Sequence, residues 1–389
     1  MILSLNKQQF RNFSLITLSN FFLFCNFSSF FLLPLYIKHL GGDEAQIGYI
    51  MGTFGITSLG TIPLVSYLLD KYGRKKFILL GSFLMFVSSF LFVLISTLDY
   101  QIYILRLIQG VAFAFFFTSA ATSVSDIVPK QSRAHGLGIF GAFTIASYAI
   151  GPSFGELIIN LFGFNQFFIY TSVFSIISFL LVLFAKDGEF VASLRPFFSG
   201  FKDIVISNRF TMLLITNLII AGGLGSMLNF FSAFLKDNEL NASSFFVTYS
   251  ITVILVRVFG GRLPDLIDRR KIVAPAILIM SISLILIIFI NTTLVAIMVS
   301  FLFSLGYGIL YPSMSAMIID RASDDERGKA MGAYNMSFSL GINFLAFALG
   351  VIARDFGLKS MYLITGIFVM LGFLIFVITN FFMSRIKNT

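Results

Sequence analysis

Acidic and basic side chains occur together where two long apolar runs of the chain meet. This segment holds one acid and four basic residues, namely Asp70, Lys71, Arg74, Lys75 and Lys76. A carboxylate is stabilised at a helix N-terminus, and an arginine pairs with a carboxylate through two parallel hydrogen bonds. Residues of these types at the ends of apolar helices can clamp neighbouring helices together by ion pairs.

A second, similar segment lies 195 positions later and contains Asp265, Asp268, Arg269, Arg270 and Lys271. Further matches have nearly the same offset, namely Asp126 with Asp320, Arg133 with Arg327 and Gly138 with Gly332 at 194, and Asn20 with Asn217 at 197. The near-constant offset indicates two related halves.

Polar side chains inside the apolar runs indicate a second kind of chemistry. Arg106 and Gln109 lie in one run, and Phe113 and Phe117 continue the same helical face at three- and four-residue spacing. A charge in lipid is costly unless it faces protein or water. We expect this face to line a cavity, with the rings of Phe113 and Phe117 below the guanidinium of Arg106. The alternative is an arginine that snorkels to the outer surface.

The composition identifies the surroundings that such helices need. Hydrophobic residues make up 57% of the 389 and charged residues 12%, with a mean hydropathy of +0.93. A soluble domain of this size has far more surface charge, so lipid is the expected solvent for most of the chain.

The same counts exclude several kinds of site. The net charge of +9 is spread over separate short loops, which argues against nucleic-acid binding. The chain has one cysteine, Cys25, and two histidines, His39 and His135, which argues against a disulfide framework, a metal centre and a hydrolase. We expect no enzyme activity, no bound metal and no cofactor.

Twelve stretches reach the length of about 20 residues that crosses a bilayer. These predicted spans are 13–37, 46–69, 77–97, 101–127, 135–160, 165–185, 210–235, 244–264, 272–291, 295–319, 330–353 and 360–384. They divide the chain into a six-helix bundle at 1–185, a cytoplasmic linker at 186–209 and a second six-helix bundle at 210–389. The predicted fold is an all-α membrane protein whose two pseudo-repeats surround a central cavity, an architecture of secondary transporters.

The distribution of lysine and arginine predicts the orientation. With the N-terminus inside, 21 of the 27 basic residues fall in inner segments and four in outer ones, and Arg106 and Arg257 lie within spans. This bias predicts that both termini are cytoplasmic.

The loop after the second span resembles a signature of the major facilitator superfamily, Gly-x-x-x-Asp-(Arg/Lys)-x-Gly-(Arg/Lys)-(Arg/Lys). The chain has Ser66 in place of the first glycine, and the second copy has Asp268 in place of the later one. In the family, this loop engages an acid that ends helix four. The resemblance implies two cytoplasmic latches, formed by Asp70, Arg74 and Asp126 and by Asp265, Arg269 and Asp320. The alternative is that these residues only fix topology.

Two further segments resemble family motifs. Arg106-x-x-Gln109-Gly110 is similar to the helix-four motif, whose arginine is associated with proton coupling. The fifth span, with Gly151, Pro152 and Gly155, is similar to the helix-five motif of exporters and antiporters. Glu156 ends this motif, and it either couples protons or reaches interfacial water.

The resemblance implies a monomeric transporter of the inner membrane that works by alternating access. We expect proton-coupled export of small amphipathic or drug-like compounds. The alternatives are transport of a specific metabolite such as a sugar, or facilitation without protons, because span one has no acid. Candidate substrate contacts are Asn26, Phe113, Tyr148, Asn229, Tyr311 and Asn343. For each asparagine or tyrosine, an interhelical hydrogen bond is the simpler interpretation.

Overall fold

The fold is helical throughout the part of the chain that the structure describes. This computed structural model describes residues 5–129, 132–186, 201–260, 263–323 and 326–386, and it has no β-strand in these ranges. A chain in lipid has to pair every backbone polar group internally, and a helix does so within one segment. The all-α architecture predicted from composition is confirmed.

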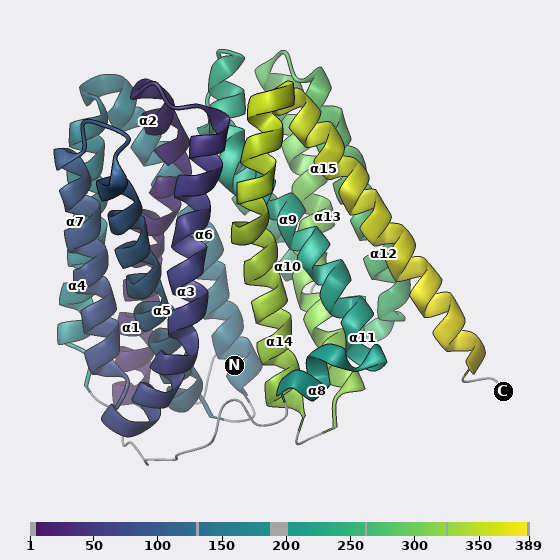
Figure 1. Ribbon diagram of the computed structural model, residues 1–389. Helices are drawn as coiled ribbons and strands as arrows, with labels where there is room; N and C mark the ends of the chain where they lie inside the picture. The colour runs from purple at the N-terminus through teal and green to yellow at the C-terminus, as the bar shows by residue number, and fades with distance from the viewer. Residues whose placement is uncertain (1–4, 130–131, 187–200, 261–262, 324–325, 387–389) are drawn as a thin grey trace. The chain divides into compact units, whose positions relative to one another are not determined.

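Long helices follow one another along the chain with short connections (Figure 1). The α-helices of the first part are α1 (Lys7–Ser29), α2 (Leu33–His39), α3 (Glu44–Tyr72), α4 (Lys75–Leu91), α5 (Tyr100–Ile127), α6 (Arg133–Phe162) and α7 (Phe164–Leu183). Those of the second part are α8 (Phe201–Ile206), α9 (Asn208–Asp237), α10 (Ser243–Gly260), α11 (Leu263–Leu266), α12 (Arg269–Leu286), α13 (Thr293–Arg321), α14 (Arg327–Ser339) and α15 (Leu345–Ile386). Short 3₁₀ turns, η1 (Phe30–Leu32), η2 (Phe92–Leu94) and η4 (Ile287–Phe289), and one π-helical turn, η5 (Leu340–Phe344), extend or join them.

Eleven helical stretches of the described chain are long and apolar enough to cross a membrane. The last stretch, Arg327–Thr379, has 53 residues and contains the predicted span 330–353 and most of the span 360–384. Gly357 interrupts it with a φ of 82°, a left-handed conformation that glycine adopts without strain. Over the described residues, each of the twelve predicted spans therefore falls on a helix, with boundaries shifted by a few residues.

The chain forms two compact units. Unit 1 comprises Met1–Gly42 and Thr53–Phe197, and unit 2 comprises Asp43–Gly52 and Phe198–Thr389. The first turns of α3 thus group with unit 2. The short helix α8 lies in the segment that the sequence predicts as a linker. The predicted division at 1–185, 186–209 and 210–389 stays a prediction.

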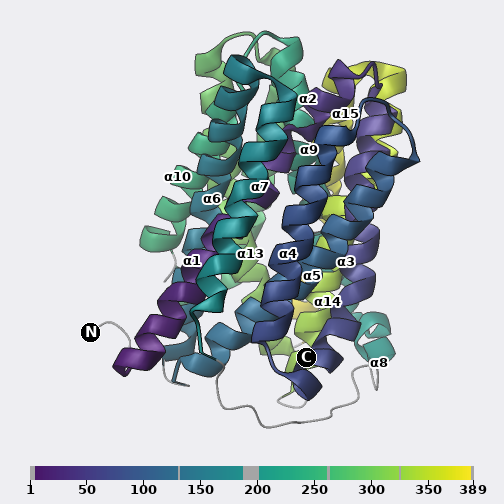
Figure 2. The ribbon, with the colours of Figure 1, turned by 90° about the vertical axis from the view of Figure 1, so that its left-hand side faces the viewer.

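Within unit 1, α1 packs against α6 and α7, and α4 packs against α5 and α7 (Figure 2). Within unit 2, α12 packs against α13 and α15, and α10 packs against α13.

One interhelical hydrogen bond in each unit mirrors the sequence repeat. Asn20 of α1 donates from Nδ2 to Oγ1 of Thr144 in α6 at 2.8 Å. Asn217 of α9 donates from Nδ2 to Oγ of Ser337 in α14 at 2.7 Å. The first pair is separated by 124 positions and the second by 120. The two halves therefore use a related polar contact to join their first and fifth long helices.

Candidate functional site

Arg106 lies on α5 in unit 1, and its side chain is only 4% exposed. Its Nη1 donates a hydrogen bond to Oε1 of Gln109, one turn along the helix, at 2.8 Å. Its guanidinium carbon lies 5.0 Å from the centre of the Phe54 ring, within cation–π range. The arginine therefore stays inside the bundle instead of extending toward the surface, and its charge meets an amide oxygen and a ring face.

Gln109 connects this arginine to three other helices. Its Nε2 lies 3.4 Å from Oγ of Ser89 in α4, and Ser89 exchanges hydrogen bonds of 3.0 and 3.1 Å with the amide of Asn26 in α1. Asn26 also donates to the backbone oxygen of Thr171 in α7 at 2.8 Å. All these side chains are buried. The result is a continuous polar network, Arg106–Gln109–Ser89–Asn26, at the centre of unit 1.

An aromatic cluster adjoins this network. The ring of Phe113 on α5 lies 5.6 Å from Phe24, 5.0 Å from Phe27 and 5.5 Å from Phe54. Further rings extend it, namely Phe117 at 5.5 Å from Phe24, and Tyr148 at 6.4 Å from Phe24 and 5.2 Å from Phe31. Phe113 and Tyr148 are half-buried, and Phe117 is exposed. The cluster is therefore open along one edge, at Phe117.

The helix-five residues place α6 in close contact with α1. A Cβ atom on Gly151 would lie 2.3 Å from Oγ of Ser28 and 2.4 Å from the backbone oxygen of Cys25. Ser29 donates from Oγ to the backbone oxygen of Gly151 at 3.0 Å. A Cβ on Gly155 would lie 2.7 Å from the ring of Phe167. Pro152 lies between the two glycines inside α6. Small residues let the two helices approach, as in other membrane helix pairs.

Glu156 follows Gly155 on α6, and its side chain is buried. It is the one acid among the described side chains that is buried. Ionisable side chains inside membrane spans commonly belong to substrate or proton pathways, so Glu156 is a candidate for such a role.

An ion pair joins Arg74, the N-cap residue of α4, to Asp126 of α5. Nε of Arg74 lies 3.1 Å from Oδ2 of Asp126, and Nη1 donates to the backbone oxygen of Leu69 at 3.0 Å. The Asp126 side chain is 54% exposed. The predicted third member, Asp70, belongs to α3, but its side chain lies outside the described residues. One of the two predicted contacts is thus present.

The matching pair of unit 2 joins Arg269 of α12 to Asp320 of α13 through Nη1 and Oδ2. Its exposures resemble those of the first pair, with the arginine largely covered and the acid open. The side chain of Asp265 lies outside the described residues. Asp268 is the N-cap of α12 and accepts from the backbone N–H of Arg270.

The candidate contacts of unit 2 all make hydrogen bonds within the protein. Asn229 donates to the backbone oxygen of Ile342 at 3.0 Å. Asn343 of η5 donates to the backbone oxygen of Ser339, the last residue of α14, at 3.0 Å. The hydroxyl of Tyr311 donates to Oδ1 of Asn335 at 3.2 Å. The side-chain amides of Asn229 and Asn343 thus donate to backbone carbonyl oxygens, as that of Asn26 does in unit 1.

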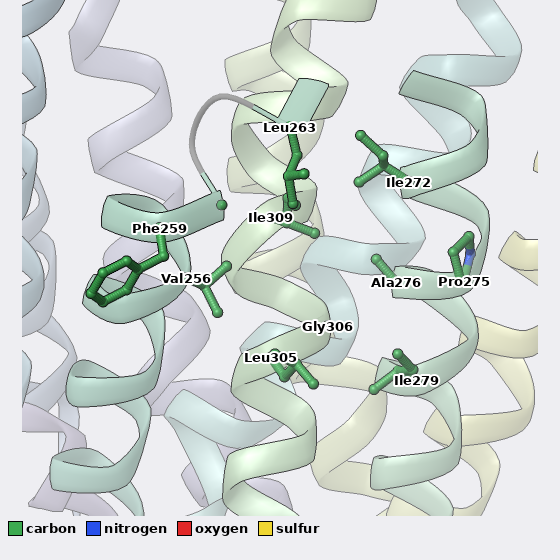
Figure 3. Close-up of a pocket in the computed structure, with 11 residues that line it drawn as sticks. Val256, Phe259, Leu263, Ile272, Pro275, Ala276, Ile279, Leu305, Gly306 and Ile309 are labelled. Carbon is green, nitrogen blue, oxygen red and sulfur yellow. The ribbon is translucent and has the colours of Figure 1, made fainter. Parts of the chain in front are cut away.

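A cavity of about 440 Å³ opens between α10, α11, α12 and α13 (Figure 3). Apolar side chains line it, among them Val256, Ile279 and Ile309. None of the predicted site residues contributes to this lining, which has no charged group for a polar ligand. In the described part of the chain, no group of histidine, cysteine or acidic side chains is arranged to hold a metal ion.

Sequence reasoning misses Ser89, Phe24, Phe27 and Phe54, which complete the site of unit 1. The serine gives no signal because serine is common in membrane helices. Each phenylalanine is one of 51 in the chain. The packing of α1, α3, α4 and α5 selects these residues.

Known proteins of one family resemble this chain over most of its length. The sequence model of the Major Facilitator Superfamily matches residues 15–243 and 238–385. Multidrug resistance protein 2 of Bacillus subtilis (strain 168) is 24% identical over 356 residues, which cover 88% of this chain and 88% of that protein. Multidrug resistance protein MdtG of Klebsiella pneumoniae (strain 342) is 26% identical over 355 residues, which cover 86% and 84%.

Solved structures show the same fold at low identity. A POT family transporter in complex with a thioalcohol conjugated peptide superposes with a TM-score of 0.83 at 12% identity, covering 98% of this chain and 99% of its own. The nucleoside transporter NupG gives a TM-score of 0.79 at 14% identity, covering 95% and 98%. The resemblance inferred from the sequence motifs is confirmed, and this chain is a multi-pass membrane transporter for small molecules that belongs to the Major Facilitator Superfamily.

Proposed function

We propose that this transporter exports small amphipathic or drug-like compounds by alternating access in exchange for protons. The observation that carries the proposal is the aromatic cluster of unit 1 beside the buried network of Arg106. Phe24, Phe27, Phe54 and Phe113 form a continuous set of rings, and Phe117 leaves an edge accessible. Aromatic faces accept apolar compounds of varied shape because their contact depends on area and not on a fixed hydrogen-bond pattern.

The relatives support this substrate class. Two proteins that align over more than four-fifths of this chain have names that describe multidrug resistance. A broad substrate range fits a site made of rings and one satisfied cation, because such a site imposes few directional requirements.

Coupling to protons needs a group that changes charge during transport. Glu156 is buried on α6 and lies next to the close approach of α6 to α1. Arg106 holds a positive charge on the same unit, and Gln109 fixes its orientation. We assign proton exchange to Glu156 and electrostatic support to Arg106.

The ion pairs act in the proposal as cytoplasmic latches. Arg74 with Asp126, and Arg269 with Asp320, hold helix ends in the two units. Exposed pairs contribute about 1 kcal/mol or less to stability, so a role in timing the conformational cycle suits them better than a role in folding. The proposal places the chain as a monomer in the inner membrane, with both termini cytoplasmic.

Purified full-length protein in sealed vesicles with an internal pH-sensitive dye tests the proposal. A pH gradient is imposed, and a panel of amphipathic compounds is added to vesicles that hold wild type, Arg106→Ala or Glu156→Gln. We expect substrate-dependent proton flux in wild type and loss of that flux in Glu156→Gln. The control is Glu239→Gln, the same substitution at an exposed acid. Substrate movement without proton flux in wild type would reject antiport, and no movement of any compound would reject export of this class.

A further inference from the structure

Two arginines lie inside membrane spans, and their surroundings differ. Arg106 of unit 1 donates to Gln109 and lies over the ring of Phe54. Arg257 of unit 2 lies in the last turn of α10, and its Nε is buried without a hydrogen-bond partner in the structure as described. No carboxylate pairs with it among the described side chains. A buried guanidinium N–H that donates to nothing is costly to retain without a function.

The position of Arg257 on α10 argues against snorkelling along the lipid face. Ser250 and Val253 are buried and precede it by seven and four residues, so the three share one face of the helix. The next two residues, Val258 and Phe259, are 70% and 80% exposed. Arg257 itself is half-buried. Its side chain therefore belongs to the inner face of α10, and the lipid face is made by its apolar neighbours.

This inner face packs against α13, where a Cβ atom on Gly308 would lie 3.5 Å from Cα of Val253. Tyr311 lies three residues after Gly308 on α13, and the charge of Arg257 acts on it and on Tyr334 of α14. Tyr334 donates its hydroxyl to the backbone oxygen of Tyr311 at 3.0 Å, and Tyr311 donates its own to Asn335 at 3.2 Å. Both phenolic protons are thus committed within the protein. The charge of Arg257 is left for another acceptor.

The surroundings of Arg257 also have a route of access and an apolar part. Asn335 is exposed and Tyr311 is half-buried, so the cluster is open on the side of α14. The ring of Phe338 lies 5.2 Å from that of Tyr311. A ligand that reaches Asn335 can place its apolar part against these rings and an acidic group beside the guanidinium.

We propose that Arg257, with Tyr311 and Asn335, forms a binding site for the anionic group of an amphipathic substrate, and that a carboxylate is the chemistry it accepts. The planar guanidinium matches the two oxygens of a carboxylate. The site refines the proposed export function and rests on it, because it names an aromatic or aliphatic acid as the substrate class. It assigns recognition of the acid to unit 2, whereas the arginine of unit 1 is already satisfied.

Binding of a matched pair of ligands to the full chain in detergent micelles tests this site without requiring transport. The probes are 1-naphthoate and 1-naphthamide, which have the same ring system and differ in charge at neutral pH. The chain has no tryptophan, so naphthyl fluorescence is read without tryptophan background. We expect wild type to bind the acid at least about tenfold more tightly than the amide, since a charge-assisted hydrogen bond contributes a free energy of that order.

The preference for the acid is expected to disappear in Arg257→Gln and to persist in part in Arg257→Lys. Arg354→Gln is the control, because it removes an exposed arginine that pairs with Asp355 elsewhere in unit 2. Tyr311→Phe, which keeps the ring, provides a second variant if Arg257→Gln does not fold. We expect Tyr311→Phe to weaken binding of the acid more than binding of the amide, because Asn335 loses the hydroxyl that holds its side chain in place.

Equal binding of acid and amide by wild type, no binding of either, or an acid preference that survives in Arg257→Gln would overturn the proposal. The proposed function is tested separately by the vesicle assay. It fails if amphipathic compounds do not exchange for protons there, whichever probe the protein prefers to bind. A chain that binds the acid through Arg257 but moves no protons would retain this site and lose the antiport mechanism.

Discussion

Nη1 of Arg106 donates a hydrogen bond of 2.8 Å to Oε1 of Gln109, and both side chains are buried on one face of α5. Gln109 in turn reaches Ser89 of α4, so a single amide orients a buried cation and joins two helices. The stability of unit 1 and the position of its charge therefore depend on the same residue.

Replacing Gln109 with alanine is expected to destabilise the protein by about 1–3 kcal/mol, because a buried donor of Arg106 loses its acceptor. The measurement is thermal unfolding in detergent. Gln101→Ala is the matched control, since Gln101 is an exposed residue near the start of the same helix. Equal unfolding temperatures for the two variants would show that Gln109 does not stabilise the buried charge.

Adding a methyl group at Gly151 is expected to separate α1 from α6. The new Cβ would meet Ser28 and Cys25 at 2.3 and 2.4 Å, and overpacking of this kind costs about 1–3 kcal/mol. We expect Gly151→Ala to lower both the unfolding temperature and the transport rate.

Gly141→Ala on the same helix is the control for this prediction. A Cβ at Gly141 meets nothing within 4 Å. Because alanine favours a helix by about 1 kcal/mol over glycine, this variant is expected to be as stable as wild type or more stable. A Gly151→Ala protein that behaves in the same way would show that α1 and α6 do not need their close approach.

The ion pair between Arg74 and Asp126 is expected to affect transport more than folding. We expect Arg74→Gln to change the free energy of unfolding by less than about 1 kcal/mol, because Asp126 is largely exposed. The transport rate in vesicles is expected to fall severalfold. The charge-reversed double variant Arg74→Asp with Asp126→Arg is expected to recover part of the rate. An unchanged rate in Arg74→Gln would mean that the pair only fixes topology.

Labelling with a membrane-impermeant maleimide is expected to reveal the orientation of the chain. The native thiol of Cys25 is fully buried and is expected to stay unlabelled. We expect Lys71→Cys to react only from the cytoplasmic side and Lys359→Cys only from the opposite side, because both positions are exposed. Reaction of both cysteines from one side would contradict the topology that the distribution of basic residues predicts.

Part of the site follows from local spacing. Residues three apart on a helix share a face, so the contact between Arg106 and Gln109 follows from their positions in the sequence. The close approach at Gly151 is likewise expected from small residues at four-residue intervals. By contrast, the bonds of Asn26 to Ser89 and Thr171 join positions 63 and 145 residues apart, and no local pattern specifies them. The pairing of Arg74 with Asp126 requires the resemblance to a family in addition to the sequence pattern.

The sequence by itself determined that the chain crosses a membrane in many apolar helices, that it is a repeat of two halves and that basic residues gather in alternate loops. These features depend on composition and on the length of apolar runs, which the bilayer converts into helices because it offers no other partner to the backbone. The tertiary structure decided which polar side chains inside the helices are satisfied. Arg106 meets Gln109, whereas Nε of Arg257 meets no acceptor in the described chain. The physical reason is that the rotation and approach of each helix are set by side-chain packing between segments that are far apart in the sequence.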